Sequence, residues 1–551
     1  IATQLAAGIT KTVLHGWAST AGAEGVTEWP GHEGMWNMFS ERFDTRQPGS
    51  EFYPLWNDAV GRHQYLLRQG RPRIDVGIVH TDHFTDNASG MVFIDAAGNR
   101  IPDENAYGRG WMRDRQNHWW QDLGMQDAGW TYEFFDGSLL LRDDVSVAGG
   151  EVQPGGPGYQ ALLVFQSALD PDVASLLLDW ATKGVPVLIV HGTRELKTLL
   201  TGDYTSHEHA AARTPGLDGR DEELAATMAQ LLALPTVREI DDAASTVDAL
   251  RDLGVVGRAE FVAENRNLLS HLRYDGDLTH LYLYHFLYET GETTTVEVAL
   301  SGSGTVHRID GWTGAVREHS GVRQDGDRTI VTVTLSPGET ALFTLDRSES
   351  AASGESTPEP TTEIVAEVPD WSIAVESWDA GELQLITEDR GLGYEAREVR
   401  PLTAITRLDA GVGALRSWKD IPAIGPDVSG VGEYSAVLPV ATLDTGARYL
   451  LDLGSTSGGL GSVRVNGDAA TGFDTSHPVV DVTDSLRQGD NSIVIRVAGS
   501  LNNRLIARGY YDTLPDVLAE ITGNGDPMQH AVVRDQGLIG PVRLLRQSTA
   551  D

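Results

Sequence analysis

The sequence contains no cysteine. This absence excludes disulfide bonds, thiolate metal sites and a cysteine nucleophile. It also contains no run of about 18 apolar residues, the length that a membrane-spanning helix needs. The first twenty residues lack the basic, apolar and small-residue order of a signal peptide. We therefore expect a chain that is cytoplasmic, already processed, or without its original start.

Basic residues are scarce. The chain has 42 Lys and Arg against 79 Asp and Glu, for a formal net charge of −37. This charge would repel phosphate groups, so it argues against nucleic acid and against anionic membranes as partners. A neutral ligand such as a sugar is compatible with it. The G-x-G-x-x-G and P-loop motifs are also missing, so the sequence predicts no nucleotide site.

The first half of the chain predicts two domains. With 551 residues, of which 40% are apolar, we expect three or four domains in all. Residues 1–74 read as a short strand at 12–14, a long loop, and a helix that stops at Gly70. Residues 75–265 alternate buried-type strands with helices. This β-α-β order predicts a parallel sheet with helices on both faces.

The second half is dominated by strands. Residues 266–347 contain strands joined by turns without helices, which predicts an antiparallel β-sandwich. Residues 348–366 are rich in Ser, Thr, Pro and Glu, as in a linker. Residues 367–551 alternate apolar and polar positions between hairpin turns, which predicts a second β-sandwich of jelly-roll type.

Candidate binding residues gather in the first 74 residues, where a strand ends in His-Gly-Trp and a long aromatic loop follows. We expect sugar contact from His15, Trp17, Trp29, His32 and Trp36. An imidazole can donate to and accept from hydroxyl groups, and indole faces stack on sugars. Glu28 and Glu33 are weak local candidates for acid–base chemistry. For His15 the alternative is a structural histidine bonded to a neighbouring loop. For the tryptophans it is packing of the long loop on itself, and for Glu28 and Glu33 it is a solvated carboxylate.

Several segments resemble one enzyme family. They are "GITKTVLHGWA", "WPGHEGMWNMFSERF", "AGWTYEFFDGSLL", "PVVDVTDSLRQGDNSIVIRVAGSLNNRLIARG" and "GLIGPVRLL". In this order they resemble the C-terminal portion of glycoside hydrolase family 106, the α-L-rhamnosidases. One departure is Glu133, which stands where the family usually has Asp.

The resemblance implies a (β/α)₈ catalytic barrel, of which residues 1–74 would be the end. A flavodoxin-like α/β domain (75–265), the β-sandwich and a galactose-binding-like jelly roll would follow. It also implies inverting hydrolysis of an α-L-rhamnosyl bond by two carboxylic groups, with calcium at the sugar site. The family's catalytic carboxylates would precede Ile1, so the catalytic residues of this chain stay unknown. We expect an N-terminal segment or a second polypeptide to complete the barrel.

Other functions stay open at this point. The chain could be a non-catalytic carbohydrate-binding or scaffolding subunit, or a glycosidase with a different sugar specificity on the same architecture. The location is open too, with secretion or the periplasm favoured over the cytoplasm.

Overall fold

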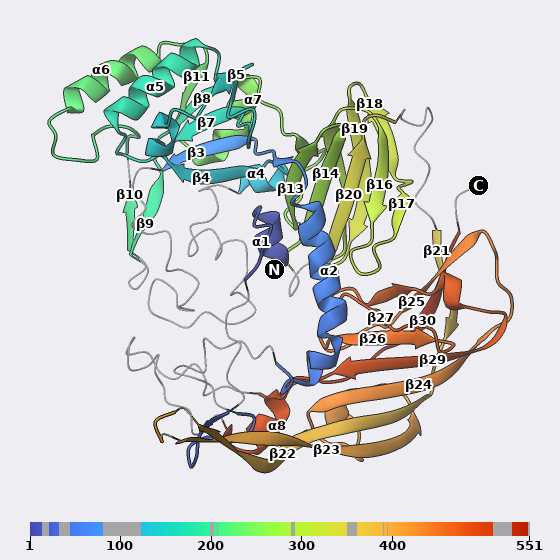
Figure 1. Ribbon diagram of the computed structural model, residues 1–551. Coiled ribbons are helices and arrows are strands. Elements are labelled where there is room, and N and C mark those ends of the chain that lie inside the picture. Colours follow the sequence, from blue (N-terminus) through green and yellow to red (C-terminus); the bar gives the residue numbers. More distant parts are fainter. Residues whose placement is uncertain are drawn as a thin grey trace. The chain divides into compact units, whose positions relative to one another are not determined.

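The computed structural model describes residues 1–13, 21–31, 44–80, 123–198, 203–206, 208–287, 292–349, 361–389, 391–393, 395–510 and 532–548. The chain forms two compact units (Figure 1). The first comprises Ile1–Thr10, His63–Asp310 and Ala315–Thr357. The second comprises Lys11–Arg62, Gly311–Gly314 and Pro358–Asp551. Helix α2 (Tyr53–Leu66) connects them along the chain.

A five-stranded parallel sheet forms one part of the first unit. Its strands are β3 (Val76–His80), β4 (Tyr132–Asp136), β7 (Ala161–Val164), β8 (Val187–Val190) and β11 (Val237–Ile240). They lie in the order β11-β8-β7-β3-β4, which counted from β4 is 2-1-3-4-5 in chain order. Their apolar residues alternate between two cores, as a sheet covered on both faces requires.

Helices cover this sheet. They are α4 (Gly124–Asp127), α5 (Pro171–Thr182), α6 (Asp221–Leu231) and α7 (Thr246–Asp252), with 3₁₀ turns η4 (Gly137–Leu141) and η5 (Ala243–Ser245). Helix α5 begins at its cap Asp170, whose carboxylate accepts the N–H of Asp172 at 2.8 Å. Small hairpins are β5 (Val147–Ala148) with β6 (Glu151–Val152), and β9 (Arg194–Thr198) with β10 (Asp203–Ser206).

Two antiparallel sheets complete the first unit and share one apolar core. One contains β2 (Arg71–Pro72), β13 (Leu268–Asp275), β14 (Leu278–His285), β16 (Thr305–Ile309), β17 (Val316–Glu318) and β20 (Thr340–Asp346). The other contains β12 (Ala259–Phe261), β15 (Thr294–Ser301), β18 (Val322–Asp325) and β19 (Arg328–Leu335). Helix α1 (Ala2–Ala6) packs its Leu5 against Tyr282 and Tyr284 on the outer face of β14.

The second unit also contains two sheets. The larger has the order β1-β23-β22-β24-β29-β26-β27. Its strands are β1 (Gly22–Ala23), β22 (Trp371–Asp389), β23 (Glu395–Gly413), β24 (Gly430–Val440), β26 (Gly461–Val465), β27 (Thr471–Gly472) and β29 (Gly489–Ala498). The smaller contains β21 (Thr361–Glu367), β25 (Ala447–Asp452), β28 (Val479–Asp481) and β30 (Arg543–Ser548). Short helical segments are η1 (Pro48–Phe52), η6 (Trp418–Asp420), η7 (Thr483–Ser485) and α8 (Asn502–Ala507).

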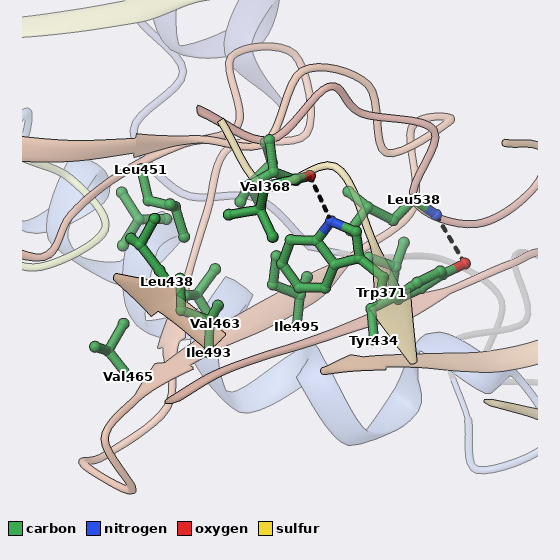
Figure 2. Close-up of a cluster of buried hydrophobic side chains, with 14 of the residues drawn as sticks. Val368, Trp371, Tyr434, Leu438, Leu451, Val463, Val465, Ile493, Ile495 and Leu538 are labelled. Carbon is green, nitrogen blue, oxygen red and sulfur yellow. Dashed lines mark hydrogen bonds between the residues drawn. The ribbon is translucent and has the colours of Figure 1, made fainter. Parts of the chain in front are cut away.

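Side chains from both sheets form the core of the second unit (Figure 2). Several of its buried aromatic side chains have hydrogen-bonded polar atoms. The indole N–H of Trp371 donates to the carbonyl of Val368 at 3.0 Å. The hydroxyl oxygen of Tyr434 accepts two N–H groups, from the indole of Trp418 at 2.6 Å and from the backbone of Leu538 at 3.0 Å. Burial raises the pKa of Tyr434 to about 12.

The structure confirms a mixed α/β and β-rich architecture, and it differs from the predictions at two places. Residues 361–366, expected to end the linker, instead form most of β21, which pairs with β30. In the described part of residues 1–74, both strands join antiparallel sheets: β1 pairs with β23 and β2 with β13. Thr12 and Val13, expected in a strand, belong to none. Across the described residues we find no helix with the length and apolar character of a membrane span.

Candidate functional site

Most of the predicted sugar-contacting residues lie outside the described part of the chain. These are His15, Trp17, His32, Glu33 and Trp36. Glu28 and Trp29 are described, and both belong to the second unit. The geometry of the candidate site is therefore described only for the residues on either side of segment 32–43.

Trp29 is a buried anchor. Its side chain is 5% exposed and packs in a small apolar cluster with Trp378 of β22 and with Leu501 and Leu505 of the α8 region. Its indole N–H donates to the hydroxyl of Thr403 on β23 at 3.1 Å. The indole thus fixes the chain where it enters segment 32–43, and the sugar contact predicted for Trp29 stays a prediction.

Glu28 occupies the turn just before this anchor. Its side chain is exposed, and its carbonyl accepts the N–H of Gly31 at 2.7 Å. Its predicted role in acid–base chemistry stays a prediction.

A buried ion pair brings the two ends of segment 32–43 together. Asp44 and Arg46 are 1% and 5% exposed. The Nε of Arg46 donates to both carboxylate oxygens of Asp44 at 2.9 and 2.8 Å, and the Nη2 contacts the same carboxylate. The Nη1 of Arg46 donates to the carbonyl of Pro30 at 3.2 Å. Residue 30, before the segment, is therefore bonded to residue 46, after it.

Gly31 permits this approach. It has φ +128°, and a Cβ placed there would lie 2.1 Å from the Nη1 of Arg46. A larger residue would displace the guanidinium from the Pro30 carbonyl. We call the set Pro30, Gly31, Asp44 and Arg46 the loop clamp.

Helix α8 supports the same corner of the second unit. Arg504 donates to the carbonyl of Trp378 at 3.3 Å and to the hydroxyl of Ser377 at 3.0 Å. Its Nη1 lies 3.4 Å from Asp379. Asn503 exchanges two hydrogen bonds with the backbone of Arg534, both at 2.9 Å, so α8 also holds the chain where it returns from segment 511–531. Two segments of the chain, 32–43 and 511–531, thus begin or end beside one anchored cluster.

The carboxyl edge of the parallel sheet in the first unit is the other place where a ligand is expected in such folds. His191 follows β8 there. Its Nδ1 accepts the N–H of Ala210 at 3.0 Å, and its Nε2 lies 3.1 Å from Glu239. Both ring nitrogens therefore have protein partners. His80 ends β3 and is buried, stacked on Phe165 with ring centroids 5.8 Å apart. These contacts are typical of histidines that stabilise the fold.

The described residues contain no group of three or more His, Asp or Glu side chains arranged to hold a metal ion. The calcium that the resemblance implies stays a prediction. Sequence reasoning missed the loop clamp and the partners of Trp29. Asp44-Thr-Arg46 carries a local signal, an acidic and a basic residue two positions apart after an aromatic loop, whereas no local signal links Trp29 to Trp378.

One solved structure is similar to nearly the whole chain. The chain is similar over 98% of its length to a solved rhamnosidase from Novosphingobium sp. PP1Y, with a TM-score of 0.62 and 18% sequence identity. The chain has a rhamnosidase-like fold. It spans 45% of that neighbour's chain. A GH42 β-galactosidase from G. stearothermophilus matches 52% of the chain at 10% identity, covering 42% of its own, with a TM-score of 0.27. No protein-family model and no curated protein matches the sequence.

Proposed function

We propose that this chain is part of a glycoside hydrolase of the α-L-rhamnosidase type. The enzyme would hydrolyse terminal α-L-rhamnosyl, or related deoxy-sugar, bonds with inversion. The observation that carries this proposal is the similarity of nearly the whole chain to one rhamnosidase structure. The strong negative charge is compatible with a neutral sugar substrate, and it argues against nucleic acid and anionic membranes as partners.

The finer assignments of the fold belong to this proposal. The strand order 2-1-3-4-5 supports a flavodoxin-like α/β domain. The two antiparallel sheets around one core support a β-sandwich, and the sheets of the second unit support a galactose-binding-like jelly roll. Membership of glycoside hydrolase family 106 would account for all three of these domains.

The chain would supply accessory domains and part of the sugar pocket. Inverting hydrolysis needs one carboxylic acid to protonate the leaving oxygen and one carboxylate to activate water, roughly 6.5–9.5 Å apart. From the resemblance we propose that the acid and base belong to a barrel-forming segment or a second polypeptide. We also propose that the loop clamp and Trp29 hold the segment bearing His32, Glu33 and Trp36.

The test uses the protein purified from its source cells in the particle in which it occurs there. Intact mass shows whether a barrel-bearing polypeptide accompanies the 59.5 kDa chain or is continuous with it. A panel of aryl glycosides then tests the reaction. Release from aryl α-L-rhamnoside, with the β-anomer of the sugar formed first in NMR spectra, supports the proposal. Preference for another glycoside replaces the sugar but keeps the enzyme class.

A non-catalytic carbohydrate-binding subunit is the second candidate. It is favoured if the native particle consists of the 59.5 kDa chain alone, hydrolyses no aryl glycoside and is retained on a glycan resin. For the predicted calcium, chelation by EGTA should reduce hydrolysis of the aryl rhamnoside, and added Ca²⁺ should restore it.

A further inference from the structure

Strands β22 and β23 form an unusually long antiparallel pair in the second unit. Each has 19 residues, whereas strands in globular proteins typically have about five or six. Strand β24 pairs with β22 only over residues 372–377. From Trp378 onward the outer edge of β22 has no strand partner in the part of the chain that the structure describes, while the far edge of β23 is covered by β1 at Glu398 and Val399. We call residues 378–389 and 395–405 the arm.

One face of the arm carries a mainly apolar strip, interrupted by Thr403. Residues directly opposite each other in an antiparallel pair share a face. The register therefore groups the strip, which consists of Trp378, Leu383 and Leu385 on β22 and Ile405, Pro401 and Val399 on β23. The strip starts at the Trp29 cluster, where Trp378 is buried. Val399, at 4% exposed, and Pro401 are buried as well. The exposed members are Ile405, opposite Trp378, at 54%, and Leu383 and Leu385 at 59% and 49%.

A β-bulge aims the leucines at this face. Between Ala380 and Leu383 strand β22 advances three residues while its partner advances two, from Thr403 to Pro401. Without the extra residue Leu383 and Leu385 would point to the opposite face, because side chains alternate along a strand. Exposed leucines on an unpaired strand edge are features that soluble proteins generally avoid. A protein surface that covers them accounts for both the bulge and the leucines.

We infer that the strip docks the polypeptide that carries the catalytic barrel, an inference that rests on the proposed function. The neighbouring rhamnosidase chain is longer, since the match spans 45% of it. A second copy of this chain fits the strip less well. Three partly exposed side chains offer far less than the roughly 800 Å² per partner of a standard interface. Two copies would also each bring a net charge of −37. A covalently linked or tightly assembled barrel does not need a large contact here, because linkage raises its effective concentration.

The test is hydrogen exchange of the arm in two samples: the isolated 551-residue chain, and the native particle from the source cells. Peptides covering 379–387 and 397–405 should exchange at least tenfold more slowly in the native particle. The double variant Leu383→Lys/Leu385→Lys should abolish this protection in the native particle. The matched control is Val437→Lys/Ile364→Lys, whose parent side chains are 59% and 58% exposed in the same unit. It should leave the protection of the arm unchanged.

Other outcomes overturn the inference. Equal exchange in both samples shows that the strip stays open. Protection in the isolated chain that increases with protein concentration identifies a second copy as the occupant. Concentration-independent protection in the isolated chain identifies the chain's own segments. Hydrolysis by the native particle is measured separately. If the particle is inactive but the arm is protected, the proposed function is wrong, whereas the arm is still a docking surface.

Discussion

Replacing Arg46 with methionine should release the loop clamp. The change keeps much of the aliphatic length of the side chain but removes the guanidinium. The Asp44 carboxylate, which is 1% exposed, then keeps its hydrogen bond from the backbone N–H of residue 46 but loses those from the guanidinium. The carbonyl of Pro30 loses its donor as well. Breaking a buried ion pair by removing one partner typically costs about 3–5 kcal/mol. Since about 1.4 kcal/mol is a factor of ten, exchange in the clamped segments should accelerate by roughly 100-fold to several thousand-fold.

The assay is hydrogen exchange of peptides covering 21–31 and 44–52 in the full chain. Arg142→Met is the matched control, because Arg142 and Asp144 have the same two-residue spacing and a 2.8 Å contact but are 61% and 66% exposed. The control should leave its own peptide unchanged, since exposed ion pairs contribute little. If Arg46→Met accelerates exchange no more than Arg142→Met does, the loop clamp does not hold the chain on either side of segment 32–43. The proposal that the clamp positions His32, Glu33 and Trp36 is then wrong. In an active particle the same variant should lower kcat/KM on the aryl rhamnoside.

Three further predictions concern the clamp and the two cores. Gly31→Ala should accelerate exchange in the peptides that Arg46→Met opens, because its Cβ would lie 2.1 Å from Arg46 Nη1; unchanged exchange would show that the guanidinium can move aside freely. Tyr434→Phe leaves two buried donors unpaired and should destabilise the second unit by about 2–4 kcal/mol in urea unfolding; Tyr449→Phe, which loses one partly buried donor from Asp444, should cost less. Burial lowers the pKa of His271 to about 4 from its ordinary 6.5. The unfolded chain therefore binds a proton between these values that the folded chain does not, so stability should fall by about 3 kcal/mol as pH drops from 6.5 to 4. His271→Leu should remove that part of the pH dependence, and an identical slope in the variant would refute it.

Local patterns predicted the elements of the parallel sheet. The apolar runs at 75–80, 159–165 and 185–192 correspond to β3, β7 and β8, because a strand buried on both faces needs no polar alternation. The cap Asp170 and the stop at Gly184, with φ +97°, bound α5 as expected. Residues 361–366 were misread because they continue the Ser-, Thr-, Pro- and Glu-rich stretch before them, although they end in the apolar residues Ile364, Val365 and Ala366. Their partner strand β30 lies almost at the other end of the chain, and long-range pairing overrides local composition.

The candidate site shows the same limit more sharply. An aromatic residue in a long loop can stack on a sugar or fill a core, and composition does not distinguish the two. For Trp29 the difference depends on Trp378 and Leu505, hundreds of residues away. Its burial does not weaken the case for a site at this corner, because an indole that anchors the loop lets neighbouring residues face outward at low entropic cost. The Trp29 cluster joins the loop clamp, α8 and the buried end of the arm strip. A ligand pocket and a docking surface built on this one anchored cluster would be positioned together.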